Sequence, residues 1–254
     1  MANIIPIPAL KDNYIWLIQE TDTVAIVDPG EAGPVLQVLH DQRLHPSAIL
    51  VTHHHWDHVN GIQELLKHYP VPVYGPAAES IPGRTQGLRE GGKVHLPGLD
   101  IHLQVFDVPG HTLGAIAYYG EGLLFSGDTL FTAGCGRLFE GTPAQMYESL
   151  SKLASLDETT QLYCGHEYTL ANLTFAATVE PDSSQLKTRL REVQERRAHG
   201  LPTVPATLSI ERKTNPFLRC GEPSIWLAAE HYAGKSLGSA VEVFATLRLW
   251  KDCF

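Results

Sequence analysis

Cysteine is scarce in this sequence, and its spacing excludes two common uses. The 254 residues include four cysteines, Cys135, Cys164, Cys220 and Cys253, and no two of them form a CxxC pair. Disulfide frameworks and zinc ribbons bring cysteines together in close, recurring spacings, which this chain lacks. We therefore interpret all four as ordinary thiols.

The sequence also lacks a long apolar run and a basic leader. No uncharged stretch approaches the roughly 20 residues that cross a bilayer as a helix. The first residues, MANIIPIPALKDNYI, have no basic segment ahead of an apolar one. We expect a cytoplasmic protein with no membrane partner. Because 43% of the residues are hydrophobic and 19% are charged, the chain can bury a sizeable core, which excludes intrinsic disorder.

Positive charge is scarce as well, since the formal net charge is −9. A nucleic-acid partner demands a basic surface, so we expect none. The charge is uneven: residues 1–169 carry 8 Lys/Arg against 19 Asp/Glu, a balance of −11, and residues 170–254 carry 11 against 9, a balance of +2. The basic tail suggests a small anionic ligand near the junction, and a solvated helix surface explains the same charges equally well.

Strand and helix signals divide the chain in two. Strand-length apolar runs lie at 14–19, 24–28, 48–52, 71–74, 101–108, 115–119, 123–126 and 161–164. Helix-period segments lie between some of them, at 34–42, 62–68 and 143–156, the last with Thr142 as N-cap and Pro143 at the first helical position. Beyond about residue 170 the pattern favours helices at 184–199, 224–232 and 237–250. We predict a sheet-and-helix domain over 1–169 and a helical domain over 170–254, with an irregular connector at 201–222.

Five metal-capable side chains follow one apolar strand within six residues. The strand ILVT at 49–52 leads directly into HHHWDH at 53–58. Alternate side chains of an extended segment share a face, so we expect His53, His55 and Asp57 on one side and His54 on the other. The chain must turn between Asp57 and His58, which lets this pair reach a second point. A single histidine is commonly a surface residue, but this cluster predicts metal binding, and its spacing suits two ions better than one.

Three further candidates each follow a strand and a glycine. They are His111 in VPGHT, Asp128 in FSGDT and His166 in YCGHE. A glycine permits a sharp turn and a close approach of the backbone to a ligand. With the first cluster, these residues supply five histidines and two aspartates, enough for two metal sites that share one carboxylate.

These motifs resemble the metallo-β-lactamase superfamily, and the wider sequence resembles one of its families, the hydroxyacylglutathione hydrolases or glyoxalases II. The resemblance rests on THHHWDH, PGHT, SGDTLF and CGHEY, together with KDNYIWLI, VDPG, AGCGRLFEGT and KTNPFLR. It covers essentially the whole chain. It implies the α+β class, with a four-layer αββα sandwich followed by a C-terminal helical domain that binds substrate.

The resemblance also implies roles for individual residues. It places His53, His55 and His111 on a first metal, Asp57, His58 and His166 on a second, and Asp128 between the two. It assigns substrate contacts to Arg137, Phe139, Tyr168, Arg248 and Lys251, the basic ones toward the carboxylates of glutathione. Phe139 stands where many relatives have tyrosine, and Arg137 stands where some have lysine, so hydrogen bonding to the peptide differs there.

The implied reaction is hydrolysis of a glutathione thioester, with S-D-lactoylglutathione as the expected substrate and methylglyoxal detoxification as the expected role. Two metals supply hydroxide near neutral pH and polarise the carbonyl, and Asp57 and Asp128 are the expected catalytic carboxylates. Nitrogen and oxygen ligands favour zinc, with iron or manganese as alternatives. We expect a monomer. The competing hypotheses are another hydrolase or a sulfur dioxygenase of the same superfamily, and a non-catalytic metal-binding protein.

Overall fold

The computed structural model describes residues 2–254, which form two compact units. The first contains the described residues as far as Val108, together with Leu113–Gly127. The second contains Pro109–Thr112 and Asp128–Phe254. Among the described residues, none of the helices combines the length and the apolar character that a membrane crossing requires.

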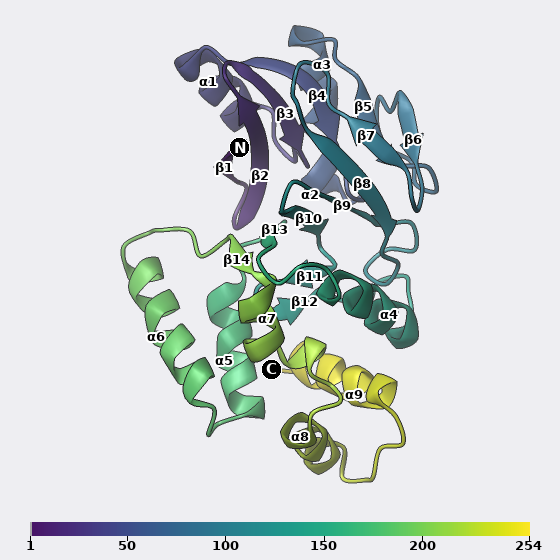
Figure 1. The fold of residues 1–254 in the computed structure, drawn as a ribbon, viewed down its shortest axis with the longest axis vertical. Coiled ribbons are helices and arrows are strands. Elements are labelled where there is room, and N and C mark those ends of the chain that lie inside the picture. Colours follow the sequence, from purple (N-terminus) through teal and green to yellow (C-terminus); the bar gives the residue numbers. More distant parts are fainter. Residues whose placement is uncertain (1) are drawn as a thin grey trace. The chain divides into compact units, whose positions relative to one another are not determined.

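The first unit contains a six-stranded sheet in the order β1 to β6. Its strands are β1 (Asn3–Ala9), β2 (Asn13–Glu20), β3 (Thr23–Val27), β4 (His45–Leu50), β5 (Val73–Pro76) and β6 (Gln86–Leu88). The first three strands are antiparallel and the remaining pairs are parallel. Helix α1 (Gly33–Gln42) connects β3 to β4, and the short helices α2 (Trp56–Val59) and α3 (Ile62–His68) connect β4 to β5 (Figure 1).

A second antiparallel set completes this unit, with β7 (Lys93–His95), β8 (His102–Asp107), β9 (Ile116–Gly120) and β10 (Leu123–Gly127) paired in sequence. The first six residues of β2 are all buried, as expected for a strand covered on both faces. On β9, the buried Tyr118 donates a hydrogen bond of 2.8 Å to the carbonyl of Val51, just beyond β4. The second strand set therefore holds the chain at the point where the histidine cluster begins.

The second unit is mainly helical. Its elements are β11 (Leu130–Phe131), β12 (Gly134–Cys135), α4 (Pro143–Ala154), β13 (Gln161–Cys164), α5 (Thr169–Val179), α6 (Ser184–Ala198), β14 (Ala206–Thr207), α7 (Leu208–Thr214), η1 (Pro216–Leu218), α8 (Pro223–Ala233) and α9 (Ala240–Asp252). Helices α5 and α6 pack on each other, and so do α8 and α9 (Figure 1). Thr142 and Gln145 form a capping box at α4, which confirms the predicted N-cap.

Side chains from the C-terminal part bind the backbone of the β11–β12 hairpin. Glu211, which is fully buried, accepts a hydrogen bond of 2.6 Å from the amide of Ala133. The amide group of Asn215 donates to two carbonyls of the hairpin, at 3.2 and 3.0 Å. Arg248 of α9 donates to the carbonyl of Cys135 at 2.8 Å. The hairpin thus satisfies its buried polar groups with residues that lie 78 to 113 positions later in the chain.

Most of the predicted strands and helices are present, one prediction needs correction, and several elements were not predicted, among them β1 and α5. The connector over 201–222 is not irregular, because it contains β14, α7 and η1. Helix α7 begins with Thr207, whose side chain accepts from the amide of Ile210, a capping signal that the prolines of this segment obscured. Helix α5 was not predicted: its residues TLANLTFAATV are apolar on several sides and have no helical stripe. The domain boundary near residue 169 stays a prediction.

Candidate metal centre and its surroundings

The carboxyl ends of β3 and β4 meet at one edge of the first sheet, because these strands are parallel. Asp28 follows β3, and Thr52 and His53 follow β4. Asp28 accepts two hydrogen bonds from Thr52, 2.8 Å from its amide and 2.7 Å from its hydroxyl. Gly127, with a φ of +50°, closes in from β10, where a Cβ atom would lie 2.3 Å from the Thr52 hydroxyl. A glycine is therefore required directly before Asp128.

Asp28 also sets which nitrogen of two histidines is available to a cation. Nδ1 of His58 lies 3.0 Å from Oδ2 of Asp28, so it carries the proton and leaves the Nε2 lone pair available. The Thr52 hydroxyl donates to Asp28, so it can accept from Nδ1 of His53, which lies 3.0 Å away. Nε2 of His53, which lies 3.2 Å from Nδ1 of His55, then carries the lone pair of this ring. Carboxylate partners of this kind fix the tautomer of metal-binding histidines.

The chain turns earlier than the alternation predicted. Helix α2 begins at Trp56 with His55 as its N-cap, so Asp57 lies on this helix beside His58 and does not continue the extended segment of His53 and His55. Asp57 is half-buried, and one carboxylate oxygen accepts a hydrogen bond of 3.0 Å from the side-chain amide of Asn13. The same oxygen lies 3.7 Å from Nε2 of His58. Asn13, which is buried at the start of β2, therefore orients the carboxylate of Asp57 toward His58.

In the second unit, His111, Asp128 and His166 converge. Oδ2 of Asp128 lies 3.5 Å from Nε2 of His111 and 3.1 Å from Nε2 of His166. Nδ1 of His111 donates to the carbonyl of Arg137 at 2.9 Å, which leaves Nε2 of this histidine as the available nitrogen. All three side chains are buried. One carboxylate oxygen between two imidazole nitrogens is the arrangement expected of a bridging ligand.

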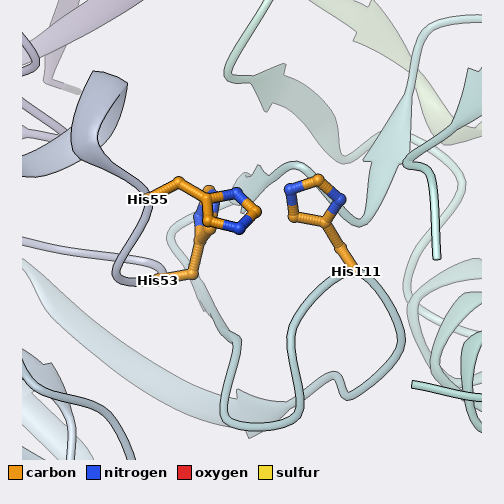
Figure 2. Close-up of side chains that lie close together, drawn as sticks. All are labelled: His53, His55 and His111. Atoms are coloured by element: carbon orange, nitrogen blue, oxygen red, sulfur yellow. The ribbon is translucent and has the colours of Figure 1, made fainter. Parts of the chain in front are cut away.

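The candidate ligands include two groups of three residues whose ligand atoms lie close together. The ligand atoms of His53, His55 and His111 lie within 4.8 Å of one another, and their three imidazoles are shown in Figure 2. The same limit holds for the ligand atoms of Asp57, His58 and His166. Imidazole nitrogens and carboxylate oxygens are ligands that zinc, iron and manganese accept. This donor set fits a divalent metal site.

The fourth histidine of the first cluster, His54, has a different partner. Its Nδ1 lies 3.0 Å from Oε2 of Glu79, a buried carboxylate in the loop after β5. The alternation along the strand predicted that His54 points away from its neighbours, and this contact agrees with that prediction.

The aromatic residues implied as substrate contacts lie against candidate ligands. Tyr168 stacks on His166, with ring centroids 4.7 Å apart and an interplanar angle of 4°. Phe139 meets His111 edge to face at 5.2 Å and is 64% exposed. The side chain of Arg137 is 63% exposed, and its Nε lies 3.4 Å from Oδ1 of Asp252. Phe139 and Arg137 are exposed and can contact a ligand without rearrangement of the core.

The two basic residues of α9 are more buried than a solvated helix end would be. Arg248 is 4% exposed; its guanidinium lies over the ring of Phe217 and 3.0 Å from Asp252. Nζ of Lys251 donates to Oδ1 of Asn172 at 2.6 Å. Burial, reinforced by the charge of Arg248, lowers the pKa of Lys251 to about 8. Whether these side chains contact a substrate stays a prediction.

Two residues near the ligands were not assigned a role from the sequence. Asp28 and Asn13 belong to the motifs VDPG and KDNY, which were used only for resemblance. A usable signal existed for Asp28, because an acidic residue directly after an apolar strand lies at the same edge as the residues after the next parallel strand. No comparable signal singles out Asn13, whose partner is 44 positions away.

Comparison with known proteins agrees with this geometry. Residues 10–166 match the family model of the metallo-beta-lactamase superfamily, and residues 167–254 match that of the hydroxyacylglutathione hydrolase C-terminus. The hydroxyacylglutathione hydrolase of Alkalilimnicola ehrlichii is 56% identical over 99% of this chain and 99% of its own. That of Nitrosomonas europaea is 50% identical over 100% and 97%. The solved structure of TTHA1623 in a di-iron-bound form has 27% identity and a TM-score of 0.60, covering 84% of this chain and 100% of that one.

The comparisons confirm the predicted fold class. The chain has the α+β metallo-β-lactamase fold with a C-terminal helical domain. They also agree with a divalent metal site built from the histidines and aspartates described above.

Proposed function

We propose, since the chain belongs to the hydroxyacylglutathione hydrolase family of the metallo-β-lactamase superfamily, that its histidine and aspartate cluster hydrolyses glutathione thioesters. The chain is a metal-dependent thioester hydrolase, and S-D-lactoylglutathione is the proposed substrate, cleaved to glutathione and D-lactate. The observation that carries the proposal is identity of 50 to 56% with hydroxyacylglutathione hydrolases along essentially the entire chain.

We propose two metal ions per chain. His53, His55 and His111 hold the first, Asp57, His58 and His166 hold the second, and Asp128 bridges them. The two ligand groups and the position of the Asp128 carboxylate support this assignment, as does the di-iron form of the similar solved structure. Zinc is the proposed metal, with iron or manganese as alternatives.

When bound, the metal pair supplies a hydroxide near neutral pH and polarises the thioester carbonyl. The protein's own groups position the reaction. We propose that Asp57, whose Oδ2 accepts a hydrogen bond from Asn13, receives the proton of the attacking water at its other oxygen, Oδ1. Asp28 keeps His53 and His58 in the tautomers that present Nε2. No side-chain nucleophile is required, and the leaving thiolate is stable without a dedicated acid.

For the substrate, we propose that Arg137, Arg248 and Lys251 attract the carboxylates of the glutathione moiety and that Tyr168 and Phe139 line its path. Phe139 packs its ring against His111, but it has no hydroxyl to donate. Tyr168 is therefore the aromatic hydroxyl of this set. We further propose a cytoplasmic monomer without nucleic-acid or membrane partners, in line with the net charge of −9.

A substrate panel tests the function. The purified protein, loaded with zinc and, in a separate sample, with iron, is given S-D-lactoylglutathione, a second 2-hydroxyacyl glutathione, a simple thioester without the peptide, a β-lactam and a persulfide of glutathione. We expect the highest kcat/KM for the 2-hydroxyacyl glutathiones. Faster turnover of the β-lactam, or oxygen consumption with the persulfide, would instead support the activity of another member of the superfamily. No turnover of any substrate at full metal loading would support a non-catalytic metal-binding protein.

A further inference from the structure

One buried carboxylate near the metal centre has no place in the proposed ligand set. Glu79 lies in the loop between β5 and β6, and its side chain is 4% exposed. An ionised carboxylate is costly to bury unless other groups compensate its charge. The partners of Glu79 therefore indicate what the residue does.

The two oxygens of Glu79 contact two different segments. Oε2 lies 3.0 Å from Nδ1 of His54, which is at ion-pair distance. Oε1 accepts a hydrogen bond of 3.1 Å from the backbone amide of Gly114. A Cβ atom at Gly114 would lie 2.5 Å from Cγ of Glu79, so only glycine permits this approach.

The loop that carries Glu79 is itself held in place. Nη1 of Arg84 donates to the carbonyl of Glu79 at 2.5 Å and to the carbonyl of Pro76. The amide of Glu79 lies 3.4 Å from the carbonyl of Pro76, which closes a turn. Because these hydrogen bonds fix the turn, the carboxylate of Glu79 can hold its partners in one position.

The partners of Glu79 adjoin the proposed ligands of one metal. His54 lies between His53 and His55 in the sequence, and Gly114 is three residues after His111. The two segments that supply the first ligand group therefore both contact the carboxylate of Glu79. We propose that Glu79 is a positioning residue for the first metal, acting through His54 and Gly114. This inference rests on the ligand assignment in the proposed function.

Positioning has a measurable consequence that a purely structural role lacks. Loss of a group that orients metal ligands typically lowers metal affinity by about 10- to 100-fold. Because the contacts with His54 and Gly114 adjoin the first ligand group, the loss should fall on one ion per chain. A carboxylate that merely stabilised the fold would lower the melting temperature of the metal-free protein and leave the difference in affinity between the two ions unchanged.

The experiment compares Glu79→Ala and Glu79→Gln with wild-type protein and with Glu64→Ala. Glu64 is a suitable control because its side chain is 48% exposed and pairs only with residues of its own helix. Each protein is loaded with zinc and titrated with a chelator, and the metal-free forms are analysed by thermal unfolding and by hydrogen exchange at the Gly114 amide.

We expect Glu79→Ala to release one zinc ion at a free-zinc concentration about 10- to 100-fold above that of wild type, with the second ion unaffected. Its Gly114 amide should exchange faster. Glu79→Gln should keep that amide protected, because the side-chain carbonyl still accepts, yet it should hold the first ion less tightly because the charge toward His54 is lost. Glu64→Ala should match wild type.

Unchanged release of both ions from the Glu79 variants would overturn the inference, and so would an equal loss of both ions. If Glu79→Ala does not fold, Glu79→Gln decides the question by the same titration. Catalytic activity is read separately: wild-type protein that binds two ions but does not cleave glutathione thioesters refutes the proposed function and leaves the role of Glu79 intact.

Discussion

Lys251 should make substrate binding depend on pH in a range where lysine normally does not titrate. Its ordinary pKa is 10.5, and burial together with the charge of Arg248 lowers it to about 8. The other charged groups around it have opposing effects: Asp252 raises the pKa and Arg137 lowers it. At pH 7 about nine tenths of Lys251 is charged, and at pH 9 about one tenth.

The proposed contact with a glutathione carboxylate requires the charged form. A charge-assisted hydrogen bond contributes about 1.5 to 3 kcal/mol, equivalent to about 10- to 100-fold in affinity. The charged fraction of Lys251 falls about tenfold between pH 7 and pH 9. With a contact that contributes about 10- to 100-fold in affinity, KM for S-D-lactoylglutathione should therefore rise about five- to ninefold over the same range, provided that the contact is equally strong in the ground and transition states.

Steady-state kinetics of three proteins test this reasoning. Lys251→Arg keeps its charge throughout the range, so its KM should vary much less with pH. Lys251→Met should have a raised KM at pH 7 and little further change. Because all three proteins receive the same substrate, titration of the substrate itself cancels. A KM profile that is identical for wild type and Lys251→Arg would refute the argument.

The same pKa shift makes a prediction about stability. Between pH 8 and pH 10.5 the unfolded chain still carries the proton on Lys251 and the folded chain does not. The free energy of unfolding should therefore rise with pH through this window, and the cost of the buried charge should be fully present below it. Denaturant unfolding of wild type and Lys251→Met should differ in slope against pH only in that range.

Three further outcomes are expected. Elemental analysis should find close to two metal ions per chain in wild type and neither at full occupancy in Asp128→Ala, since the shared carboxylate offsets the repulsion between the cations; one tightly held ion in fully active wild type would contradict the binuclear assignment. Asp28→Asn should weaken metal binding by about 10- to 100-fold, because a side-chain amide has one acceptor oxygen, whereas both oxygens of Asp28 accept, Oδ1 from the Thr52 amide and Oδ2 from the Thr52 hydroxyl and His58, and a chelator titration measures it. Glu211→Ala should lower the free energy of unfolding by about 3 to 5 kcal/mol, since it leaves the buried Arg189 without its carboxylate partner; a loss below about 1 kcal/mol in denaturant unfolding would show that the pair contributes little.

The sequence predicted those parts of the site that lie close together in the chain. The cluster at 53–58 follows one strand, so alternation could separate His54 from its neighbours, and the contact with Glu79 agrees with that separation. The glycine directly before Asp128 predicted a sharp turn and a close approach of the backbone, and Gly127 does lie against Thr52 with a positive φ. In these cases local backbone geometry decides where a side chain points.

What the sequence could not predict depends on contacts between distant segments. Glu79 gave no signal because its partner Gly114 is 35 positions away and its loop has no periodic pattern. The burial of Arg248 was equally hidden: an arginine near a helix end is usually solvated, and contacts with the carbonyl of Cys135, 113 positions earlier, and with the ring of Phe217 explain its position. Residues that orient ligands are chosen by tertiary packing, so their roles emerge only from the folded chain.

Glu211, Asn215 and Arg248 bind the β11–β12 hairpin. These contacts decide whether the C-terminal part can be removed as an independent domain. A chain cut after residue 169 would lose every one of these partners and leave an amide and three carbonyls of the hairpin without the groups that now satisfy them. The truncated protein should therefore be insoluble or partly unfolded, and it should not behave as a minimal enzyme. For the same reason, a chimera that takes its C-terminal part from a homologue should also take the hairpin sequence of that homologue. The hairpin and the C-terminal part therefore act as one structural unit, although 34 residues, 136–169, separate them along the chain.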